Sequence, residues 1–260
     1  HGRSLTTIAM GKKVYQEGFE PMPDGFRNIP FEDLEALEAN ITDDTVALAF
    51  EPIQGNSGIN IVSREYMDRA RALCTKHEVL LIIDEVQSGV ARTGRFFSYE
   101  HYGIKPDVVA AAKALSGGIP VGAVMASEEA AGVLDYGQHG TTFGGNPLVA
   151  AAGVATIKAV KEENLCERAE EMGQYMMHQL CEHIGAMDEV KDIRGVGLMI
   201  GVELNIESRP VVECMFKKKV LSNAAAGKVI RIVPPIVITK DQVDQVVEVM
   251  RACIEEASES

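Results

Sequence analysis

Short apolar runs alternate with helical patterns along the first half of the chain, in the rhythm of βαβ units. Between the first two runs, Arg64–His77 carries apolar residues on a helical stripe, and an earlier helix is predicted over Phe31–Ala39. The pattern predicts an α/β fold with a mostly parallel sheet. Its strands, apolar enough to be buried on both faces, are Thr45–Ile53, Val79–Val86, Asp107–Ala114 and Gly122–Ser127.

The second half of the chain has a different pattern. Helical spacing predicts long helices over Pro147–Val160 and Leu165–Ile184. After Gly195 come two strand-like runs, GLMIGVEL and VIRIVPPIVI, with a helix between them around Val211–Lys219. A last helix begins at the T-x-x-Q capping box of residues 239–242. Since no Gly/Ser linker separates the halves, we predict two packed domains, over residues 1–163 and 164–260.

Composition narrows the classes of function. The 260 residues are 46% hydrophobic and 24% charged, with a formal net charge of −13. Such a surface does not attract phosphate backbones or anionic lipid, so nucleic-acid or membrane binding is not expected. No run approaches the roughly 18 apolar residues of a membrane span, and the first residues lack the apolar core of a secretion signal, which predicts a cytoplasmic protein.

The cysteines predict neither a disulfide framework nor a metal site. They are five in number, widely spaced, and never arranged as C-x-x-C. We therefore expect reduced and mostly buried side chains at Cys74, Cys166, Cys181, Cys214 and Cys253.

Polar residues at the carboxyl ends of predicted strands are the first candidates for a site, because ligands of open α/β sheets bind there. One strand ends with Asp84, whose carboxylate must pair or serve a ligand if it is buried. It could instead cap the next turn or pair with Arg92. The following strand ends with Lys113, just before a double glycine. Desolvation would make this lysine a usable nucleophile, whereas the alternative is a side chain that extends to solvent.

Asp84 and Lys113 together fit one kind of chemistry. A lysine that forms a Schiff base and a carboxylate that keeps a pyridine nitrogen protonated are the pair that pyridoxal phosphate requires. A third feature, HGTTFGGNP over residues 139–147, places glycines and threonines before a helix. It suits a phosphate, although such a loop can be a plain turn. It matches neither common nucleotide-binding motif, which disfavours a nucleotide ligand.

Five motifs resemble, in order and spacing, those of the class III pyridoxal-phosphate aminotransferases. The resemblance covers essentially the whole chain and implies a fold-type I transferase, with a large domain around a mostly parallel sheet and a small α+β domain. Residues 12–41 and 227–239 are most similar to acetylornithine aminotransferases, with ornithine aminotransferases next. The motifs are EPIQGNSG (51–58), LLIIDEVQSGVARTGRFF (80–97), KPDVVAAAKALSGGIPVGA (105–123), HGTTFGGNPL (139–148) and IRIVPP (230–235).

The resemblance implies a role for each matched cofactor residue. Lys113 would form the Schiff base, and Asp84 would hold the pyridine nitrogen protonated. Gln87 would hydrogen-bond near the 3-hydroxyl of the ring. Thr142 would reach the cofactor phosphate of the partner subunit in a homodimer.

Three further residues match substrate-contacting positions of the family. Thr141 would face the substrate, and Arg3 would receive a substrate carboxylate. Arg231 would clamp the α-carboxylate, which suits its planar pair of donors. Without the resemblance, Arg231 would be read as a strand-edge arginine paired with a surface acid.

The implied reaction moves the terminal amino group of N-acetylornithine to 2-oxoglutarate, a step of arginine biosynthesis. Alternatives within the family are ornithine, succinylornithine and 4-aminobutyrate aminotransferases. An alternative of another class is a catalytically incompetent fragment or assembly module.

Two departures from the family pattern affect these expectations. Asn56 stands where the family usually has a glutamate that can pair with the arginine matched by Arg231, so we expect weaker discrimination between the donor and glutamate. The family's phosphate cup and its ring-stacking aromatic residue would lie ahead of His1 and are not in this sequence. We therefore expect an incomplete large-domain sheet, in which Val79–Val86 lacks pairing partners.

Overall fold

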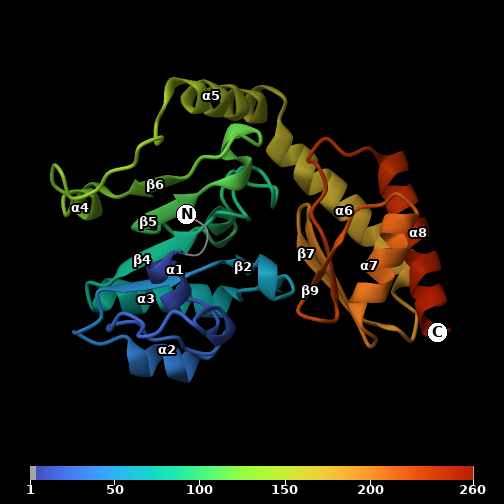
Figure 1. The fold of residues 1–260 in the computed structure, drawn as a ribbon, viewed down its shortest axis with the longest axis horizontal. Helices are drawn as coiled ribbons and strands as arrows, with labels where there is room; N and C mark the ends of the chain where they lie inside the picture. The colour runs from blue at the N-terminus through green and yellow to red at the C-terminus, as the bar shows by residue number, and fades with distance from the viewer. Residues whose placement is uncertain (1–3, 260) are drawn as a thin grey trace.

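The computed structural model describes residues 4–259, which form two units that each contain a four-stranded sheet (Figure 1). We call residues 4–163 the large unit and residues 164–259 the small unit. Helix α5 (Pro147–Glu162) ends where α6 (Leu165–Ile184) begins, and Asn164 between them has a left-handed backbone with φ 51°. The chain therefore turns sharply here. The division into two domains at residue 163 stays a prediction.

The sheet of the large unit is mostly parallel, as predicted. Its order is β1 (Ala47–Phe50), β4 (Leu80–Asp84), β5 (Val108–Ala111) and β6 (Ala123–Ala126). The first three strands are parallel and β6 is antiparallel to β5. Because β4 pairs with β1 on one edge and β5 on the other, the expectation that it lacks partners was wrong.

The predicted burial on both faces does not hold: β4 and β5 are buried on one face and half-buried on the other, and the edge strands β1 and β6 are more exposed. Leu81 and Ile83 of β4 are fully buried, whereas Val124 of the edge strand β6 is 73% exposed. The strands are also shorter than predicted. The run that begins at Thr45 stops as a strand at Phe50, and Ile53–Gln54 forms a separate strand, β2, paired with β3 (Asn60–Ile61).

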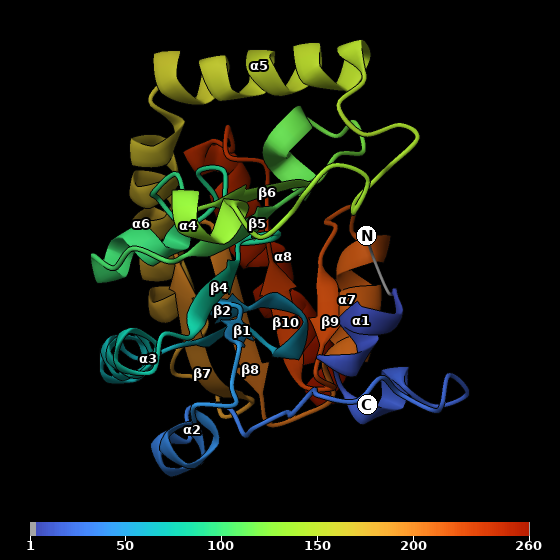
Figure 2. The same cartoon turned by 90° about the vertical axis from the view of Figure 1, so that its left-hand side faces the viewer.

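Two helices pack together on one side of the large sheet (Figure 2). They are α2 (Leu34–Asn40) and α3 (Arg64–Lys76). The side chain of Asp33 caps α2 and that of Ser63 caps α3, each by accepting a hydrogen bond from a backbone N–H of the first turn. Met67 and Cys74 of α3 join Leu81 and Ile83 in one buried core. The shorter elements of the unit are α1 (Leu5–Ala9), α4 (Glu128–Ala131) and the 3-10 helices η1 (Lys13–Tyr15), η2 (Gly55–Ser57), η3 (Ser98–Tyr102) and η4 (Lys113–Ser116).

The small unit is an antiparallel sheet packed against three helices, which confirms the predicted α+β pattern. The sheet order is β7 (Val190–Val196), β8 (Met199–Leu204), β10 (Val229–Ile232) and β9 (Asn223–Ala225). The apolar faces of α6, α7 (Ser208–Lys217) and α8 (Lys240–Ser258) form its core. The predicted capping box at Thr239 and Gln242 begins α8.

Two cysteines contradict the expectation of reduced thiols. Cys214 on α7 and Cys253 on α8 form a disulfide, with their Cα atoms 5.7 Å apart. They are 39 residues apart in sequence, and only the packing of the two helices brings them together. Cys74, Cys166 and Cys181 are free, as expected.

Backbone packs directly on backbone where the two units meet. A Cβ atom on Gly173 of α6 would overlap the carbonyl oxygen of Gly197, which lies in the β7–β8 turn. A Cβ on Gly197 would in turn lie 2.5 Å from the carbonyl carbon of Thr93 in the large unit. The neighbouring Arg92 donates from Nη1 to the carbonyl oxygens of Leu198 (3.1 Å) and Pro234 (2.6 Å). Glycine at 197 therefore allows the two units to approach so closely, and glycine at 173 allows α6 to pack against the β7–β8 turn.

Candidate active site

The carboxyl ends of β1, β4 and β5 bring three charged side chains to one edge of the large sheet. Phe50, the last residue of β1, is level with Ile83, so Glu51 directly follows β1 while Asp84 is the last residue of β4. Asp84 is level with Ala110, and Lys113 follows three residues later in η4. The expectation that parallel strands place Asp84 and Lys113 at the same edge is met, and Glu51 lies beside them.

The contacts of Asp84 leave part of its carboxylate free. Oδ1 accepts a hydrogen bond of 2.8 Å from the backbone N–H of Val86 in the following turn. Within the described residues, Oδ2 has no hydrogen-bond partner. The alternative pairing with Arg92 does not occur, because that guanidinium donates to carbonyl oxygens at the unit interface. Asp84 thus caps its turn with one oxygen and presents the other to the strand ends.

Lys113 combines an unusual backbone with a perturbed ammonium group. Its φ of 46° lies in the left-handed region, which costs a non-glycine residue roughly 1–3 kcal/mol and is found most often at functional sites. The residue is exposed in this chain, yet desolvation by partial burial lowers the pKa of its ammonium group. The Glu51 and Asp84 carboxylates oppose that shift, and Arg231 adds to it. A lowered pKa makes the neutral amine more available.

Glu51 is the residue of this site that the sequence reasoning missed. Burial raises the pKa of its carboxyl, and the nearby Asp84 carboxylate raises it further. A hydrogen bond from the Gly55 N–H and the charge of Lys113 act in the opposite direction. The signal was present in the sequence, since Pro52 ends the strand at this point. Taking the strand on to Ile53 placed Glu51 in its interior.

Glu51→Gln should stabilise the cofactor-free protein near neutral pH. A carboxyl whose pKa is raised by folding contributes most to stability below its ordinary pKa of 4.5, and loses that contribution as the pH rises through the folded value. The variant should therefore unfold at higher urea than wild type at pH 7.5, and the difference should disappear below pH 4.5. Glu17→Gln, at an exposed loop position, is the matched control. Equal stability of Glu51→Gln and wild type at pH 7.5 would contradict a raised pKa for the Glu51 carboxyl.

Gln87 contributes a buried acceptor with no partner. Its Oε1 is inaccessible to solvent and accepts no hydrogen bond from the described residues. The side chain lies against Gly55, where a Cβ atom would overlap Oε1. A buried amide oxygen without a donor is costly, so a ligand hydroxyl that donates to it would relieve that cost.

Arg231 reaches the site from the small unit. Its Nη1 donates to Asn56 Oδ1 at 2.8 Å and to the carbonyl oxygen of Gly55 at 3.2 Å. Its Nε is buried and has no partner among the described residues. Burial lowers the pKa of the guanidinium and Glu51 partly offsets the shift. Arg231 is therefore not paired with a surface acid, and its Nε is a donor that an anion could satisfy.

The remaining predicted residues lie apart from this cluster or outside the described residues. Thr141 and Thr142 are exposed in the segment that precedes α5, and no hydrogen bond joins either to Asp84 or Lys113 within the described chain. The helix itself is capped by Asn146, whose side chain accepts a hydrogen bond from the N–H of Val149. Arg3 lies outside the described residues.

The fold and this arrangement of lysine, carboxylate and arginine define a cofactor-dependent transferase, and comparison with known proteins identifies the family. The aminotransferase class-III family model matches residues 1–254. The chain belongs to the class III aminotransferase family, whose members use pyridoxal phosphate.

The named relatives include both acetylornithine and ornithine aminotransferases. The acetylornithine aminotransferases of Methanothermobacter thermautotrophicus and Methanocaldococcus jannaschii are 46% and 44% identical over 251 residues, 96% of this chain. The ornithine aminotransferase of an Exiguobacterium species is 42% identical over 260 residues, 99% of this chain. The matches cover 64%, 63% and 64% of these relatives, respectively, so the chain spans slightly less than two thirds of their length.

Solved structures agree with the fold. The ornithine aminotransferase of Toxoplasma gondii superposes with a TM-score of 0.94 at 35% identity, over 99% of this chain and 63% of its own. The acetylornithine aminotransferase of Elizabethkingia anophelis gives 0.84 at 36% identity, over 92% and 62%. These matches confirm the predicted fold class.

The residues present fit pyridoxal phosphate. Asp84 offers a free carboxylate oxygen, Lys113 an amine of lowered pKa and Gln87 a buried acceptor without a donor. A pyridine nitrogen, an aldehyde and a ring hydroxyl are the groups that these three would meet. Among residues 4–259, no group of histidine, cysteine and acidic side chains is arranged to hold a metal ion, and no helix is long and apolar enough to cross a membrane.

Proposed function

We propose that the protein transfers the terminal amino group of N-acetylornithine to 2-oxoglutarate, in arginine biosynthesis. The observation that carries the proposal is the convergence of Asp84, Lys113 and Arg231 from three distant segments of the chain. Membership of the family implies amino-acid and oxo-acid substrates. The choice of N-acetylornithine rests on the resemblance of residues 12–41 and 227–239 and on the two acetylornithine aminotransferases that are 44% and 46% identical.

In this mechanism, Asp84, Lys113 and Gln87 hold pyridoxal phosphate. When bound, the cofactor supplies an electron sink conjugated to the amino group that is transferred. Asp84 Oδ2 holds a proton on the ring nitrogen, and Gln87 Oε1 accepts from the ring hydroxyl. Lys113 Nζ would be the general base that takes a proton from the substrate carbon bearing the amino group, and the general acid that gives a proton back in the reverse direction. Its lowered pKa keeps a larger fraction in the basic form at neutral pH.

Arg231 binds the α-carboxylate of the substrate. Its buried Nε and its second terminal nitrogen give it two donors beyond the bond from Nη1 to Asn56, the arrangement that suits a carboxylate. The roles of Arg3, as a second carboxylate-binding residue, and of Thr141, at the substrate-facing position, stay predictions from the family resemblance.

We also propose a homodimer in which Thr142 serves the cofactor phosphate of the partner subunit. The support comes from the segment around Thr142, which is itself exposed. In the same segment, Phe143 is 80% exposed and Tyr136 is fully exposed. A surface of this kind is typical of an interface. The cytoplasm is the compartment that we predict.

A panel of amino donors tests the proposed substrate. The protein with added pyridoxal phosphate should use N-acetylornithine with a higher kcat/KM than ornithine, succinylornithine or 4-aminobutyrate, with 2-oxoglutarate as the acceptor. A preference for ornithine would instead indicate the activity for which the ornithine aminotransferase relatives are named. If the purified protein does not take up the cofactor, as judged by its visible absorbance, the alternative of a non-catalytic assembly module holds.

Asn56→Glu should change the balance between the two half-reactions. A carboxylate at this position can pair with Arg231, whereas the neutral amide leaves that guanidinium available in both half-reactions. We expect the KM for 2-oxoglutarate to rise about 5- to 10-fold relative to the KM for the donor, which corresponds to roughly 1 kcal/mol. Asn56→Gln, equal in length but neutral, is the control. An unchanged ratio of the two KM values would count against this role of Asn56.

A further inference from the structure

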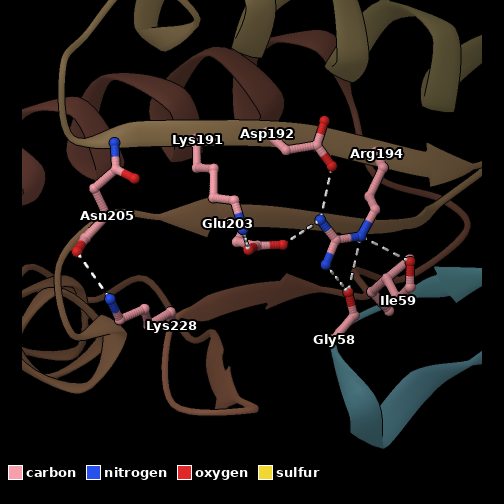
Figure 3. A network of polar contacts seen from close by, with 8 residues as sticks. All are labelled: Gly58, Ile59, Lys191, Asp192, Arg194, Glu203, Asn205 and Lys228. Atoms are coloured by element: carbon pink, nitrogen blue, oxygen red, sulfur yellow. Dashed lines mark hydrogen bonds and ion pairs between the residues drawn. The ribbon is translucent and has the colours of Figure 1, made fainter.

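A second arginine of the small unit, Arg194, donates hydrogen bonds to the same turn as Arg231. Figure 3 shows the contacts of Arg194. Arg194 on β7 donates from Nη1 to Asp192 and Glu203, each at 2.7 Å. Its other nitrogens face the large unit, where Nη2 donates to the carbonyl oxygen of Gly58 at 2.7 Å and Nε donates to those of Gly58 and Ile59, both at 3.1 Å. One side of the guanidinium is thus fixed by carboxylates, and the other side binds two successive carbonyl groups.

The turn that Arg194 holds is strained. Gly58 has φ 105° and Ile59 has φ 58°, and the second value is rare for a β-branched residue. Ile59 is fully buried and packs with Ile53 and Met199 in a small core between the units. Two successive left-handed residues cost roughly 1–3 kcal/mol at the isoleucine alone, and they persist only where the surroundings fix them. The paired carbonyl acceptors of Arg194 and the buried isoleucine side chain supply that constraint.

The register of the small sheet explains why the two arginines meet one turn. Arg194 of β7 is opposite Gly201 of β8, and Gly201 is opposite Arg231 of β10. Residues level with one another on adjacent strands point to the same face, so the two arginines flank Gly201 on one side of the sheet. A Cβ on Gly201 would lie 3.1 Å from Ile59, which therefore sits over the gap between them.

The two ends of the turn are bound by different arginines. Arg194 takes the carbonyl oxygens of Gly58 and Ile59, and Arg231 donates to Gly55 and Asn56 at the other end. Along the chain, only Ser57 lies between Asn56, which Arg231 binds, and Gly58, which Arg194 binds. A shift of the Gly58–Ile59 end would therefore move the two acceptors that orient the Arg231 guanidinium.

The two arginines differ in whether acidic side chains balance their positive charge. Burial alone would lower the pKa of Arg194, but its hydrogen bonds to Asp192 and Glu203 outweigh that effect and raise it. Glu203 also pairs with Lys191, so the positive charge of Arg194 is matched by acidic partners. Arg231 has no carboxylate within ion-pair distance among the described residues. Of these two arginines, Arg231 is therefore the one whose positive charge is left to bind the substrate anion.

We propose that Arg194 is a positioning residue for substrate binding: it fixes the strained Gly58–Ile59 turn, so that Gly55 and Asn56 hold Arg231 in the orientation that receives the substrate α-carboxylate. The inference rests on the proposed function, because it assigns Arg194 to the carboxylate site of that reaction. Arg194 itself touches neither cofactor nor substrate in this role.

Arg194→Gln tests the proposal through affinity for a carboxylate. With the pyridoxal-phosphate-loaded protein, the Kd for 2-oxoglutarate should rise about 10-fold, equivalent to about 1.4 kcal/mol. The Kd for the cofactor and the rate of amine transfer from butylamine, which has no carboxylate, should stay within about 2-fold of wild type. In the cofactor-free protein, the backbone amides of residues 54–61 should exchange hydrogen faster than in wild type.

Lys191→Gln is the matched control, because Lys191 pairs with the same Glu203 carboxylate but does not touch the turn. It should leave both the 2-oxoglutarate affinity and the amide exchange unchanged. Arg194→Lys keeps the charge beside Asp192 and Glu203 but cannot span both carbonyl groups, so it should show the same loss of affinity with a smaller loss of stability.

Several results would overturn the proposal. They are wild-type affinity for 2-oxoglutarate in either Arg194 variant, an equal slowing of butylamine transfer, or a Lys191→Gln variant that behaves like Arg194→Gln. A failure of the proposed function is distinct from these. In that case wild type itself would bind neither cofactor nor 2-oxoglutarate, while the exchange rates of residues 54–61 would still show whether Arg194 holds the turn.

Discussion

Lys113→Ala should reduce amine transfer to the background rate, a loss of more than about 10³-fold. The variant removes the amine that, in the proposed function, attaches the cofactor and moves the proton. The visible absorbance of the bound cofactor should disappear with the activity. Both can be followed on one sample, by spectroscopy and by glutamate formation from 2-oxoglutarate.

Lys105→Ala is the control, because this exposed lysine lies just before β5 and outside the site. It should keep the absorbance and the rate of wild type. A Lys113→Ala protein that retained both properties would overturn the assignment of Lys113.

Gly197→Ala should destabilise the protein by about 3 kcal/mol or more. The new methyl group would lie 2.5 Å from the carbonyl carbon of Thr93 and 2.9 Å from the carbonyl oxygen of Arg92, so backbone would have to move. Overpacking of this kind costs roughly 1–3 kcal/mol, and the left-handed φ of 55° adds about 1–2 kcal/mol for a residue with a Cβ. Urea unfolding of the cofactor-free protein measures the loss.

Gly103→Ala separates the two contributions. Gly103 also has a left-handed backbone, with φ 67°, but an added Cβ there would meet nothing within 4 Å. This control should lose only the conformational part, about 1–2 kcal/mol. Equal losses for the two variants would show that the close approach of Gly197 to Thr93 carries no cost.

Local signals predicted the regular elements well. The helix over Leu165–Ile184 has the bounds expected from its apolar spacing, and α8 begins at its capping box. The strands were placed correctly but drawn too long, because apolar content does not show where pairing stops. The error mattered at β1, where an overlong strand hid Glu51 at its end.

Long-range features could not be predicted from local patterns. Arg194 reads as an ordinary strand residue, and its contacts with Gly58 and Ile59 join segments 135 and 136 residues apart. The Cys214–Cys253 disulfide depends in the same way on how two helices pack. The family resemblance supplied Arg231, whereas its pairing with Asn56 required the docked units.

The span of chain between Arg231 and Gly55, 176 residues, has a consequence for how the site is built during synthesis. The strand ends that carry Asp84 and Lys113 leave the ribosome early and need only their own sheet. Arg231 is made much later, and it reaches its partners only when the small sheet has formed and docked. Contacts between residues that lie so far apart in the sequence form slowly, and the domain that is synthesised first generally folds first. The side chains of Asp84 and Lys113 should therefore come together before Arg231 joins them.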